Sequence, residues 1–322
     1  MFHKNALIIR FSSFGDIVQS AFAADSLKEQ GYQVDLLTKN EFREAFKSGD
    51  FGFTNVLGLS KGSSMGNLWW LAGFASDQNY DLVYDAHNNQ RSLLFKVLLC
   101  LRSPKFLFRI KKRSKFRLKR FLLFKFRINK FPKPFKGAVS FLDPLNLKPQ
   151  PKEKNRAKKT NRILLAPSAA WDLKKWPEKN WIQLAKKLQD ELETVHEVAF
   201  LGGPGDQFID SLQRAVPKSA NLAGKLSWSE TVSVIKEAKA LISGDTGVLH
   251  VADFFGVPAV ALMGPSAFGF PTRDSSKVIF RDLTCQPCSK DGRGECKIKE
   301  TKKCLTSISA DEVFEELRKG LS

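Results

Sequence analysis

Hydrophobic residues along this chain occur in short apolar runs, and each run is followed by a polar turn and a segment that is apolar on one face. The clearest case is residues 240–265, where an apolar run ends at Ser243 and Gly244, an amphipathic segment covers 246–255, and a second apolar run covers 259–263. Buried strands are apolar throughout, whereas surface helices are apolar along one stripe. This stretch is therefore predicted to form a strand, a tight turn, a helix and a second strand.

The same alternation fills both halves of the chain. In the first half it predicts strands at 6–10 and 34–38, a helix over 17–30 that ends at Gly31, an irregular segment at 51–70, and a strand followed by a helix within 80–92. In the second half it predicts strands at 162–166 and 197–201, helices that begin at Pro177 and Ser229, and a final helix over 311–319. Two such series predict two Rossmann-like α/β domains that face each other across a cleft.

A polar basic stretch, residues 148–162 with Pro149 and Pro151, separates the two series and is the predicted domain boundary. The chain of 322 residues, with 43% hydrophobic and 26% charged residues, is long enough for two globular domains. Its apolar runs fall short of the roughly 20 residues that span a bilayer. Residues 1–10 lack the layout of a signal peptide. A soluble cytoplasmic protein is therefore expected.

The formal net charge of +19 indicates an anionic partner. Much of this charge lies in residues 104–136, which hold fourteen Lys or Arg, eight Phe and no acidic residue. The favoured interpretation is an amphipathic element on an anionic membrane or glycolipid, with cations at the headgroups and aromatic side chains inserted. Two alternatives stay open: a solvated helical hairpin whose aromatic side chains pack on the domain, and, less favoured, a nucleic-acid surface, for which no recognition motif is present.

The sequence offers little to a cofactor or a metal ion. The turn after the first strand has one glycine where a dinucleotide-binding fold has G-x-G-x-x-G, so nicotinamide and flavin cofactors are not expected. No Asp-x-Asp is present to hold Mg²⁺ or Mn²⁺. Cys100 is expected to be a small buried hydrophobe. A four-thiolate zinc site, spaced C-x2-C-x7-C-x7-C, is a less favoured alternative at Cys285, Cys288, Cys296 and Cys304.

Four motifs resemble those of the heptosyltransferase family, the ADP-heptose:lipopolysaccharide enzymes. They are Arg-Phe-Ser-Ser-Phe-Gly-Asp-Ile-Val at 10–18, Tyr-Asp-Leu-Val-Tyr-Asp-Ala-His-Asn-Asn-Gln-Arg-Ser at 80–92, Pro-Ser-Ala-Ala-Trp-Asp-Leu-Lys-Lys-Trp-Pro at 167–177, and Ser-Gly-Asp-Thr-Gly-Val-Leu-His-Val-Ala at 243–252, with Gly-Val-Pro and Met-Gly-Pro downstream. The sequence departs from the family pattern at Tyr84, where an aliphatic residue is more usual, and at Ser168, where glycine is common. The resemblance covers residues 7–317 and is weak across 42–77 and 104–136.

The resemblance implies the GT-B fold and a glycosyltransferase that moves a heptose from ADP-heptose to a lipopolysaccharide core acceptor, with inversion and without a metal ion. Residues 1–150 would form the acceptor-binding domain, with 104–136 as an insertion. Residues 160–305 would bind the nucleotide sugar, and residues 306–322 would form a helix that packs back across the interface. The implied partners are an ADP-heptose donor, an anionic glycolipid acceptor and the cytoplasmic face of the inner membrane, on which the protein would be peripheral.

Two other functions remain open at this point. One is transfer from another nucleotide sugar, such as a UDP-hexose, to a different glycolipid. The other is a basic nucleic-acid-binding protein that keeps the scaffold without activity. The matched motif residues argue against the second of these, because a protein without catalysis has no need of them.

The resemblance also implies site residues. Asp16 would be the catalytic base that accepts the proton of the acceptor hydroxyl, although a carboxylate there also complements the helix dipole. The donor diphosphate and nucleotide would contact Lys174, Asp206, Asp245, Thr246, Gly247 and His250. The acceptor would contact Ser12, Ser13, Gly15, Asp85, His87 and Arg91.

Simpler structural roles are open for several of these residues. The helix start at Asp245 and Thr246 is a ready anion site, but the two side chains could equally cap the helix, with His250 packed beneath it. Lys174 could be a solvated lysine. Asp206 could be a helix cap and His87 a packed or capping histidine.

Overall fold

The computed structural model divides the chain into two compact units. The structure describes residues 4–60, 62, 65–132, 134–150, 160–191, 197–266, 268–298 and 300–321. The first unit is Met1–Lys115 with Ala138–Pro151, and the second is Phe116–Gly137 with Lys152–Ser322. Residues 116–137 thus belong to the second unit, whereas the sequence predicted the whole stretch 104–136 as an insertion in the N-terminal domain.

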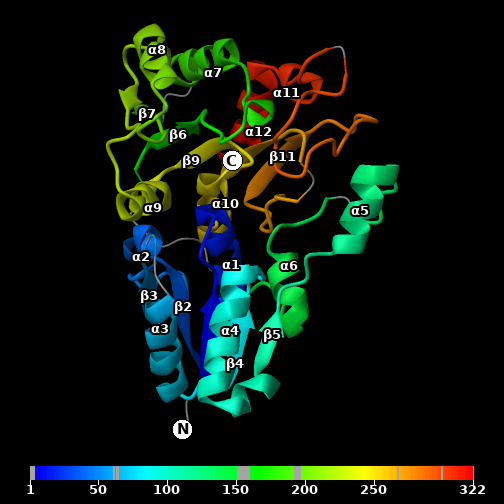
Figure 1. The fold of residues 1–322 in the computed structure, drawn as a ribbon. Helices are drawn as coiled ribbons and strands as arrows, with labels where there is room; N and C mark the ends of the chain where they lie inside the picture. The colour runs from blue at the N-terminus through cyan, green and yellow to red at the C-terminus, as the bar shows by residue number, and fades with distance from the viewer. Residues whose placement is uncertain are drawn as a thin grey trace. The chain divides into compact units, whose positions relative to one another are not determined.

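The first unit is built on a five-stranded parallel sheet in the order β3-β2-β1-β4-β5 (Figure 1). Its strands are β1 Lys4–Ile9, β2 Tyr32–Lys39, β3 Asn55–Leu59, β4 Leu82–Asp85 and β5 Ile110–Lys112. Its helices are α1 Phe14–Glu29, α2 Asn40–Phe46, α3 Met65–Asp77, α4 Gln90–Arg102, η1 Pro104–Phe108, α6 Val139–Leu142 and η2 Asp143–Leu145. The strand order reverses between β1 and β4, and ligands of such sheets bind at the carboxyl ends of the strands beside this point.

The core of the first unit lies between the sheet and the helices α3 and α4. Leu7 and Ile9 of β1 alternate in sequence, so they share one face of the strand, and they are fully buried against Leu71 of α3 and Phe95 and Leu99 of α4. Burial of apolar side chains contributes about 1.5–3 kcal/mol each. The predicted strand at 6–10 and the predicted strand and helix within 80–92 are confirmed.

The prediction of an irregular segment at 51–70 is wrong. The structure has strand β3 there, paired in parallel with β2, and the start of α3. The strand signal is weak because β3 is a short, half-buried strand at the sheet edge and contains Gly58. A side chain at Gly58 would collide with Asn40, whose Oδ1 lies 1.7 Å from the position of a Cβ atom. Close packing therefore explains the glycine that argued against a strand.

The second unit is built on a six-stranded parallel sheet in the order β11-β10-β9-β6-β7-β8 (Figure 1). Its strands are β6 Arg162–Ala166, β7 Glu197–Phe200, β8 Ala220–Asn221, β9 Ala240–Gly244, β10 Ala259–Met263 and β11 Ser276–Phe280. Its helices are α5 Arg117–Phe126, η3 Asp172–Lys174, α7 Glu178–Glu191, α8 Phe208–Ala215, α9 Trp228–Glu237, α10 Gly247–Phe255, α11 Lys303–Thr306 and α12 Ala310–Leu321. The predicted unit at 240–265 is confirmed as β9, α10 and β10, and the strand order is that of a Rossmann sheet, with its reversal between β6 and β9.

The C-terminal helix α12 packs inside the second unit. Its residues Val313, Phe314 and Leu317 are buried in the core that contains Trp181 of α7. An ion pair between Glu312 and Arg281 fixes it further, with Arg281 Nη1 2.8 Å from Glu312 Oε1. The sequence predicted a return of this helix across the domain interface, and what the structure describes is packing against its own sheet.

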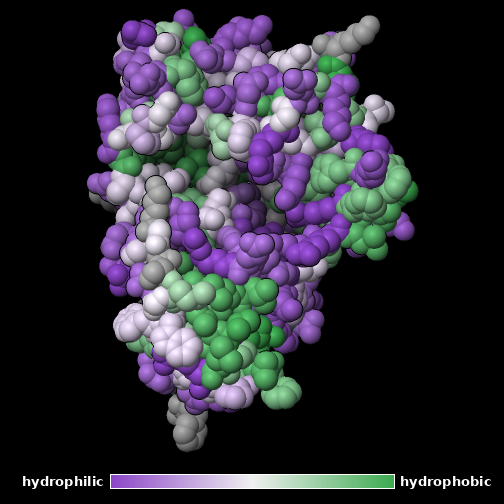
Figure 2. All heavy atoms as spheres, in the orientation of Figure 1, coloured by the Kyte–Doolittle hydropathy of each residue, from purple (hydrophilic) through white to green (hydrophobic). Residues whose placement is uncertain are grey.

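The basic Phe-rich stretch is only partly exposed. In the second unit Leu123, Phe131 and Phe135 are buried together and pack against Phe116, Phe124 and Phe268. This cluster agrees with the alternative in which the aromatic side chains pack on a domain. Figure 2 shows apolar side chains gathered over α4 and the segment that follows it, and others over α5. Within the described part of the chain, every helix is too short or too polar to cross a bilayer.

Candidate functional site

Asp16 lies in the first turn of α1, directly after β1, and the chain's own cations surround it. Its carboxylate forms an ion pair with Arg10 and lies 3.4 Å from Nη1 of Arg113. Ser13, the N-cap residue, donates its hydroxyl hydrogen to Asp16 Oδ2 at 3.0 Å. The Asp16 side chain keeps 31% of its surface exposed. The carboxylate is thus held in a fixed position and is still open to a hydroxyl group from outside.

Arg113 was not predicted as a site residue. The sequence assigned it to a membrane-binding stretch, but its guanidinium lies 3.6 Å from the ring centre of Phe141 and donates hydrogen bonds to Ser140 Oγ at 2.8 and 3.1 Å. These contacts aim it at Asp16, which is 97 residues away in sequence. Of the other predicted acceptor residues on this turn, Ser13 is exposed and Gly15 is buried within the start of α1.

Asp85 is an internal anchor, and its predicted contact with an acceptor needs correction. Its side chain is fully buried and pairs with Lys96 of α4 at 2.5 Å. The hydroxyl of Ser92 donates to the carboxylate at 2.9 Å, and the backbone amides of His87 and Asn88 donate to it at 3.2 and 2.6 Å. A carboxylate with no exposed surface and this many partners shapes the turn between β4 and α4 and has no room for a ligand.

His87 is half-buried beside this turn and lies against Phe11, with the ring centres 5.4 Å apart. Burial, reinforced by the charge of Arg10 and opposed by that of Asp16, lowers the pKa of His87 to about 4. Its Nδ1 atom is buried without a hydrogen-bond partner among the described residues. His87 is therefore a neutral imidazole near Asp16. Arg91 is exposed in the first turn of α4.

In the second unit, Asp245 and Lys174 form a largely buried ion pair at the N-terminus of α10. Lys174 Nζ lies 2.6 Å from Asp245 Oδ2, and the two side chains are 14% and 10% exposed. Ser266 donates its hydroxyl hydrogen to the same carboxylate oxygen at 2.6 Å, and His250 Nε2 lies 3.7 Å from Oδ1. The alternative of a solvated lysine at 174 is wrong, because η3 and the α10 turn bury its side chain.

Helix capping does not explain Asp245 or Thr246. Thr246 is the N-cap residue of α10, yet within the described residues its side chain makes no capping hydrogen bond and lies instead 2.8 Å from Ser243 Oγ. The first amides of α10, from Gly247 onward, have no partner inside the helix by the geometry of an α-helix. The N-terminus therefore presents backbone donors and the positive end of the helix dipole beside Lys174.

Ionisation of Asp245 is favoured despite its burial. Burial raises its pKa, but the charges of Lys174 and His250 and the hydrogen bonds from Lys174 and Ser266 outweigh it and hold the pKa below the ordinary value. Burial alone disfavours a carboxylate. The pair is thus a fixed positive and negative charge held together in a site from which most water is excluded.

Two glycines let neighbouring loops approach this pair closely. A Cβ atom at Gly269 would lie 2.2 Å from Asp245 Oδ1, and one at Gly292 would lie 2.9 Å from Lys174 Cγ. Gly292 also has a φ of +96°, which favours glycine. Neither contact is visible in the sequence pattern, because Gly269 and Gly292 lie in two separate loops, Lys174 ends η3 and Asp245 follows strand β9.

Asp206 closes the turn after β7. The amide of Gly203 donates to its carboxylate at 2.6 Å, and the amide of Asp206 donates back to the carbonyl of Gly203 at 3.1 Å. Helix α8 begins two residues later, at Phe208. Gln207, and not Asp206, is the N-cap residue of α8, so the Asp206 side chain closes the turn before the helix and does not cap it, and it stays partly exposed.

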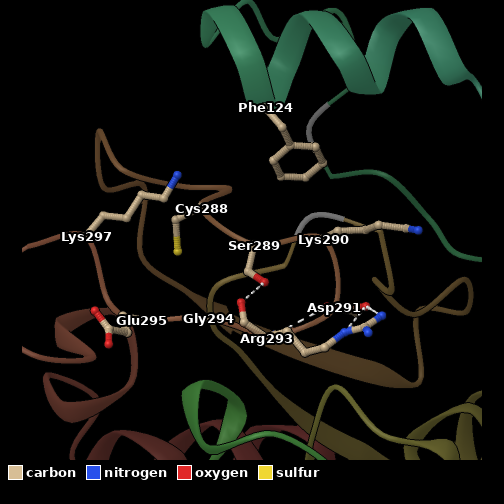
Figure 3. Close-up of a pocket in the computed structure, with 9 residues that line it drawn as sticks. All are labelled: Phe124, Cys288, Ser289, Lys290, Asp291, Arg293, Gly294, Glu295 and Lys297. Atoms are coloured by element: carbon tan, nitrogen blue, oxygen red, sulfur yellow. Dashed lines mark hydrogen bonds and ion pairs between the residues drawn. The ribbon is translucent and has the colours of Figure 1, made fainter.

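A shallow pocket of about 440 Å³ lies beside the loop that begins at Cys288 and runs to Lys297 (Figure 3). Its lining mixes Phe124 with charged groups, among them the ion pair of Asp291 and Arg293 at 2.5 Å.

The four cysteines of this region influence one another. Burial, reinforced by the neighbouring side chains of Cys288, Cys285 and Cys296, raises the pKa of Cys304 to about 11. No group of three or more His, Cys, Asp or Glu side chains is placed to hold a metal ion in the described ranges. The zinc alternative therefore gains no support from the structure.

Comparison with known proteins points to one family. The model of glycosyltransferase family 9 (heptosyltransferase) matches residues 119–299, more than half of the chain. Lipopolysaccharide heptosyltransferase 2 of Escherichia coli (strain K12) is 32% identical over 114 residues, which are 33% of this chain and 32% of that protein. The chain thus spans about a third of the length of this curated relative.

Solved structures resemble the chain over nearly its whole length. The glycosyl transferase family 9 from Veillonella parvula DSM 2008 has a TM-score of 0.70 and 18% identity, with 99% of this chain and 97% of that chain covered. The E. coli heptosyltransferase WaaC with ADP-2-deoxy-2-fluoro heptose has a TM-score of 0.66 and 16% identity, with 98% and 99% covered. These similarities confirm the predicted fold of two Rossmann-like α/β domains.

Proposed function

Because the chain belongs to glycosyltransferase family 9, the heptosyltransferase family, we propose that it transfers a heptose from ADP-heptose to a lipopolysaccharide core acceptor. The names of its relatives support the reaction class, and the ADP-heptose analogue named with WaaC supports the donor. Each half of the reaction is assigned to one unit: the acceptor to the first and the nucleotide sugar to the second.

The observation that carries the proposal is the Lys174–Asp245 pair at the N-terminus of α10. A diphosphate needs cationic and N–H donors, and Lys174, the α10 amides at Gly247 and the helix dipole supply them together. Asp245 is the counter-charge that orients Lys174, 2.6 Å away, before the donor binds. Donors already in position stabilise the negative charge that grows on a departing diphosphate without first reorganising.

Asp16 is the proposed base of the transfer. The acceptor hydroxyl gives its proton to the Asp16 carboxylate while its oxygen forms a bond to the anomeric carbon of the heptose. The bond from that carbon to the diphosphate oxygen breaks, and its electron pair leaves with ADP. Attack opposite to the leaving group inverts the anomeric configuration. The ion pairs with Arg10 and Arg113 hold the Asp16 carboxylate in position.

The transfer is proposed to proceed without a metal ion. The sequence has no Asp-x-Asp, and Lys174 with the α10 N-terminus supplies positive charge at the place where a metal ion would otherwise act. His250 would contact the donor through its Nε2 atom, which lies 3.7 Å from Asp245 Oδ1. Asp206 would meet the ribose hydroxyls.

The protein is proposed to work in the cytoplasm, peripheral on the inner membrane. A lipopolysaccharide acceptor is anionic and embedded in lipid, and the net charge of +19 suits both the acceptor and the membrane surface. The basic Phe-rich stretch 104–136 carries fourteen of the cations. Ser12, Ser13, His87 and Arg91 would lie on the acceptor side, near Asp16 or on the neighbouring turn.

Titration calorimetry with ADP, UDP, GDP and ADP-heptose tests the donor site. We expect binding of ADP and ADP-heptose that falls at least tenfold in Lys174→Gln, because a charge-assisted contact contributes about 1.5–3 kcal/mol and 1.4 kcal/mol is tenfold. Lys175→Gln is the matched control, since the Lys175 ammonium lies over the Phe208 ring, 5.4 Å from its centre, and not beside Asp245. Asp16→Asn should keep ADP affinity and lower kcat by about 10²–10⁴-fold.

Other outcomes point elsewhere. Selective binding of UDP or GDP would identify another nucleotide sugar as the donor. If the folded protein binds none of the four ligands, the transferase proposal is refuted. Tight, salt-dependent binding of random RNA in that case would identify a nucleic-acid-binding protein on the same scaffold.

A further inference from the structure

The outward face of α4 is apolar, although the outer face of a helix that covers a sheet is normally polar. One side of α4 packs into the core of the first unit through Phe95 and Leu99. On the other side Leu93, Val97 and Leu101 are 55%, 47% and 69% exposed. Side chains four residues apart share one face of a helix. These three therefore form an apolar stripe directed away from the core.

The short helix η1 extends this stripe. It packs against α4, and Phe106, fully buried in the same core, fixes its orientation. The next two side chains remain in solvent, with Leu107 64% and Phe108 94% exposed. Figure 2 shows the apolar area over α4 and the segment after it. We call the exposed set the α4–η1 face: Leu93, Val97, Leu101, Leu107 and Phe108.

The chain around the α4–η1 face carries charge of one sign. Residues 86–115 contain nine Lys or Arg and no Asp or Glu. Of these, Arg91 at the start of α4, Lys105 in η1 and Lys111 and Lys112 in β5 are exposed. An apolar surface in a cationic segment matches a bilayer with anionic headgroups, whose surface attracts the cations and whose interior accepts the apolar side chains.

We propose that the α4–η1 face is the surface through which this protein docks on an anionic lipid bilayer, with Leu107 and Phe108 inserted among the acyl chains. A second copy of the chain is a poorer occupant, because a two-fold contact would bring the same cations together. The inference deepens the membrane association of the proposed function and rests on it for its biological role. It places the contact on α4 and η1 and not on Phe131 and Phe135, which are buried.

Co-sedimentation with vesicles tests the assignment, using phosphatidylcholine mixed with phosphatidylglycerol and phosphatidylcholine alone. Leu107→Gln/Phe108→Gln and Leu93→Gln/Leu101→Gln should each lower the partition coefficient on the anionic vesicles about tenfold or more. Val278→Gln is the matched control, because Val278 is a 39% exposed apolar residue in the second unit. It should bind as the parent does. Equal thermal unfolding of all variants establishes that each remains folded.

Several results would overturn the assignment. The first is that both double variants bind anionic vesicles as the parent does, and the second is that Val278→Gln loses as much binding as they do. The third is that the parent binds neutral and anionic vesicles equally. The fourth is that sedimentation velocity shows a dimer of the parent that the double variants abolish. Calorimetry with ADP separates this inference from the donor proposal, since the double variants should keep the parent's ADP affinity. Vesicle binding without ADP binding would refute the donor site and leave the docking surface standing.

Discussion

The substitution Lys96→Met tests whether Asp85 is part of the scaffold or a contact to the acceptor. Lys96 Nζ lies 2.5 Å from Asp85 Oδ2, and the two side chains are 7% and 0% exposed. Methionine nearly matches the length of lysine and removes the charge. The change leaves the Asp85 carboxylate buried, and the donors that remain to it among the described residues are the Ser92 hydroxyl and two backbone amides.

The expected loss of stability follows from this geometry. Two unit charges 2.5 Å apart attract by about 7 kcal/mol at an effective dielectric constant of ~20. The cost of desolvating both ions cancels much of this attraction, whereas removal of one partner leaves the other buried and uncompensated, which costs about 3–5 kcal/mol. Asp85→Asn should cost a similar amount. The double variant should lose about 2–3 kcal/mol less than the sum of the two single variants.

Native-state hydrogen exchange of the amides in β4 and α4 is the assay, because it reports the free energy of unfolding of the first unit separately from the second. Lys112→Met is the control, since Lys112 is exposed at the end of β5 and should change stability by no more than about 0.5 kcal/mol. Lys96→Met as stable as the parent, or single variants whose effects simply add, would refute the reasoning. Loss of acceptor affinity in Asp85→Asn at unchanged stability would restore Asp85 to the acceptor site.

Two further predictions concern the donor site and pH. Gly269→Ala should weaken ADP binding at least tenfold by calorimetry, because its Cβ would lie 2.2 Å from Asp245 Oδ1; Gly320→Ala, whose Cβ meets only an ordinary contact at 3.9 Å, should not. Burial lowers the pKa of His87 from 6.5 to about 4, so the unfolded chain binds more protons between these values. The stability that neutral His87 contributes is full above pH 6.5 and lost as the pH falls through 4. Tm should thus fall less steeply with acid in His87→Asn, and parallel curves for parent and variant would contradict this.

Much of the candidate site was predictable because turn residues follow strands in sequence. Asp16 follows β1, and Asp245 and Thr246 follow β9, so a strand and a helix that the local pattern predicts also place these residues at the carboxyl edge of a sheet. The contacts that their side chains make were harder to predict from the sequence. Thr246 was expected to cap α10 if it had a structural role, and in the structure it contacts Ser243.

The missed residues are those whose partners are distant in sequence. Arg113 stands in a basic run, residues 104–136, whose composition favours a membrane role. Its contact with Asp16 spans 97 residues and exists because β5 lies next to β4 in the sheet and β4 next to β1. No local period carries that information.

Sequence alone determined the two α/β units, because the apolar period of a strand or helix is set by backbone geometry within a few residues. Tertiary structure alone decided which charged residues became partners and which apolar residues stayed exposed. Lys174 meets Asp245 across 71 residues, and Asp85 is buried while Phe108 is exposed. Such outcomes depend on strand order and on which side of an element faces the sheet, and these are set by packing of the whole unit.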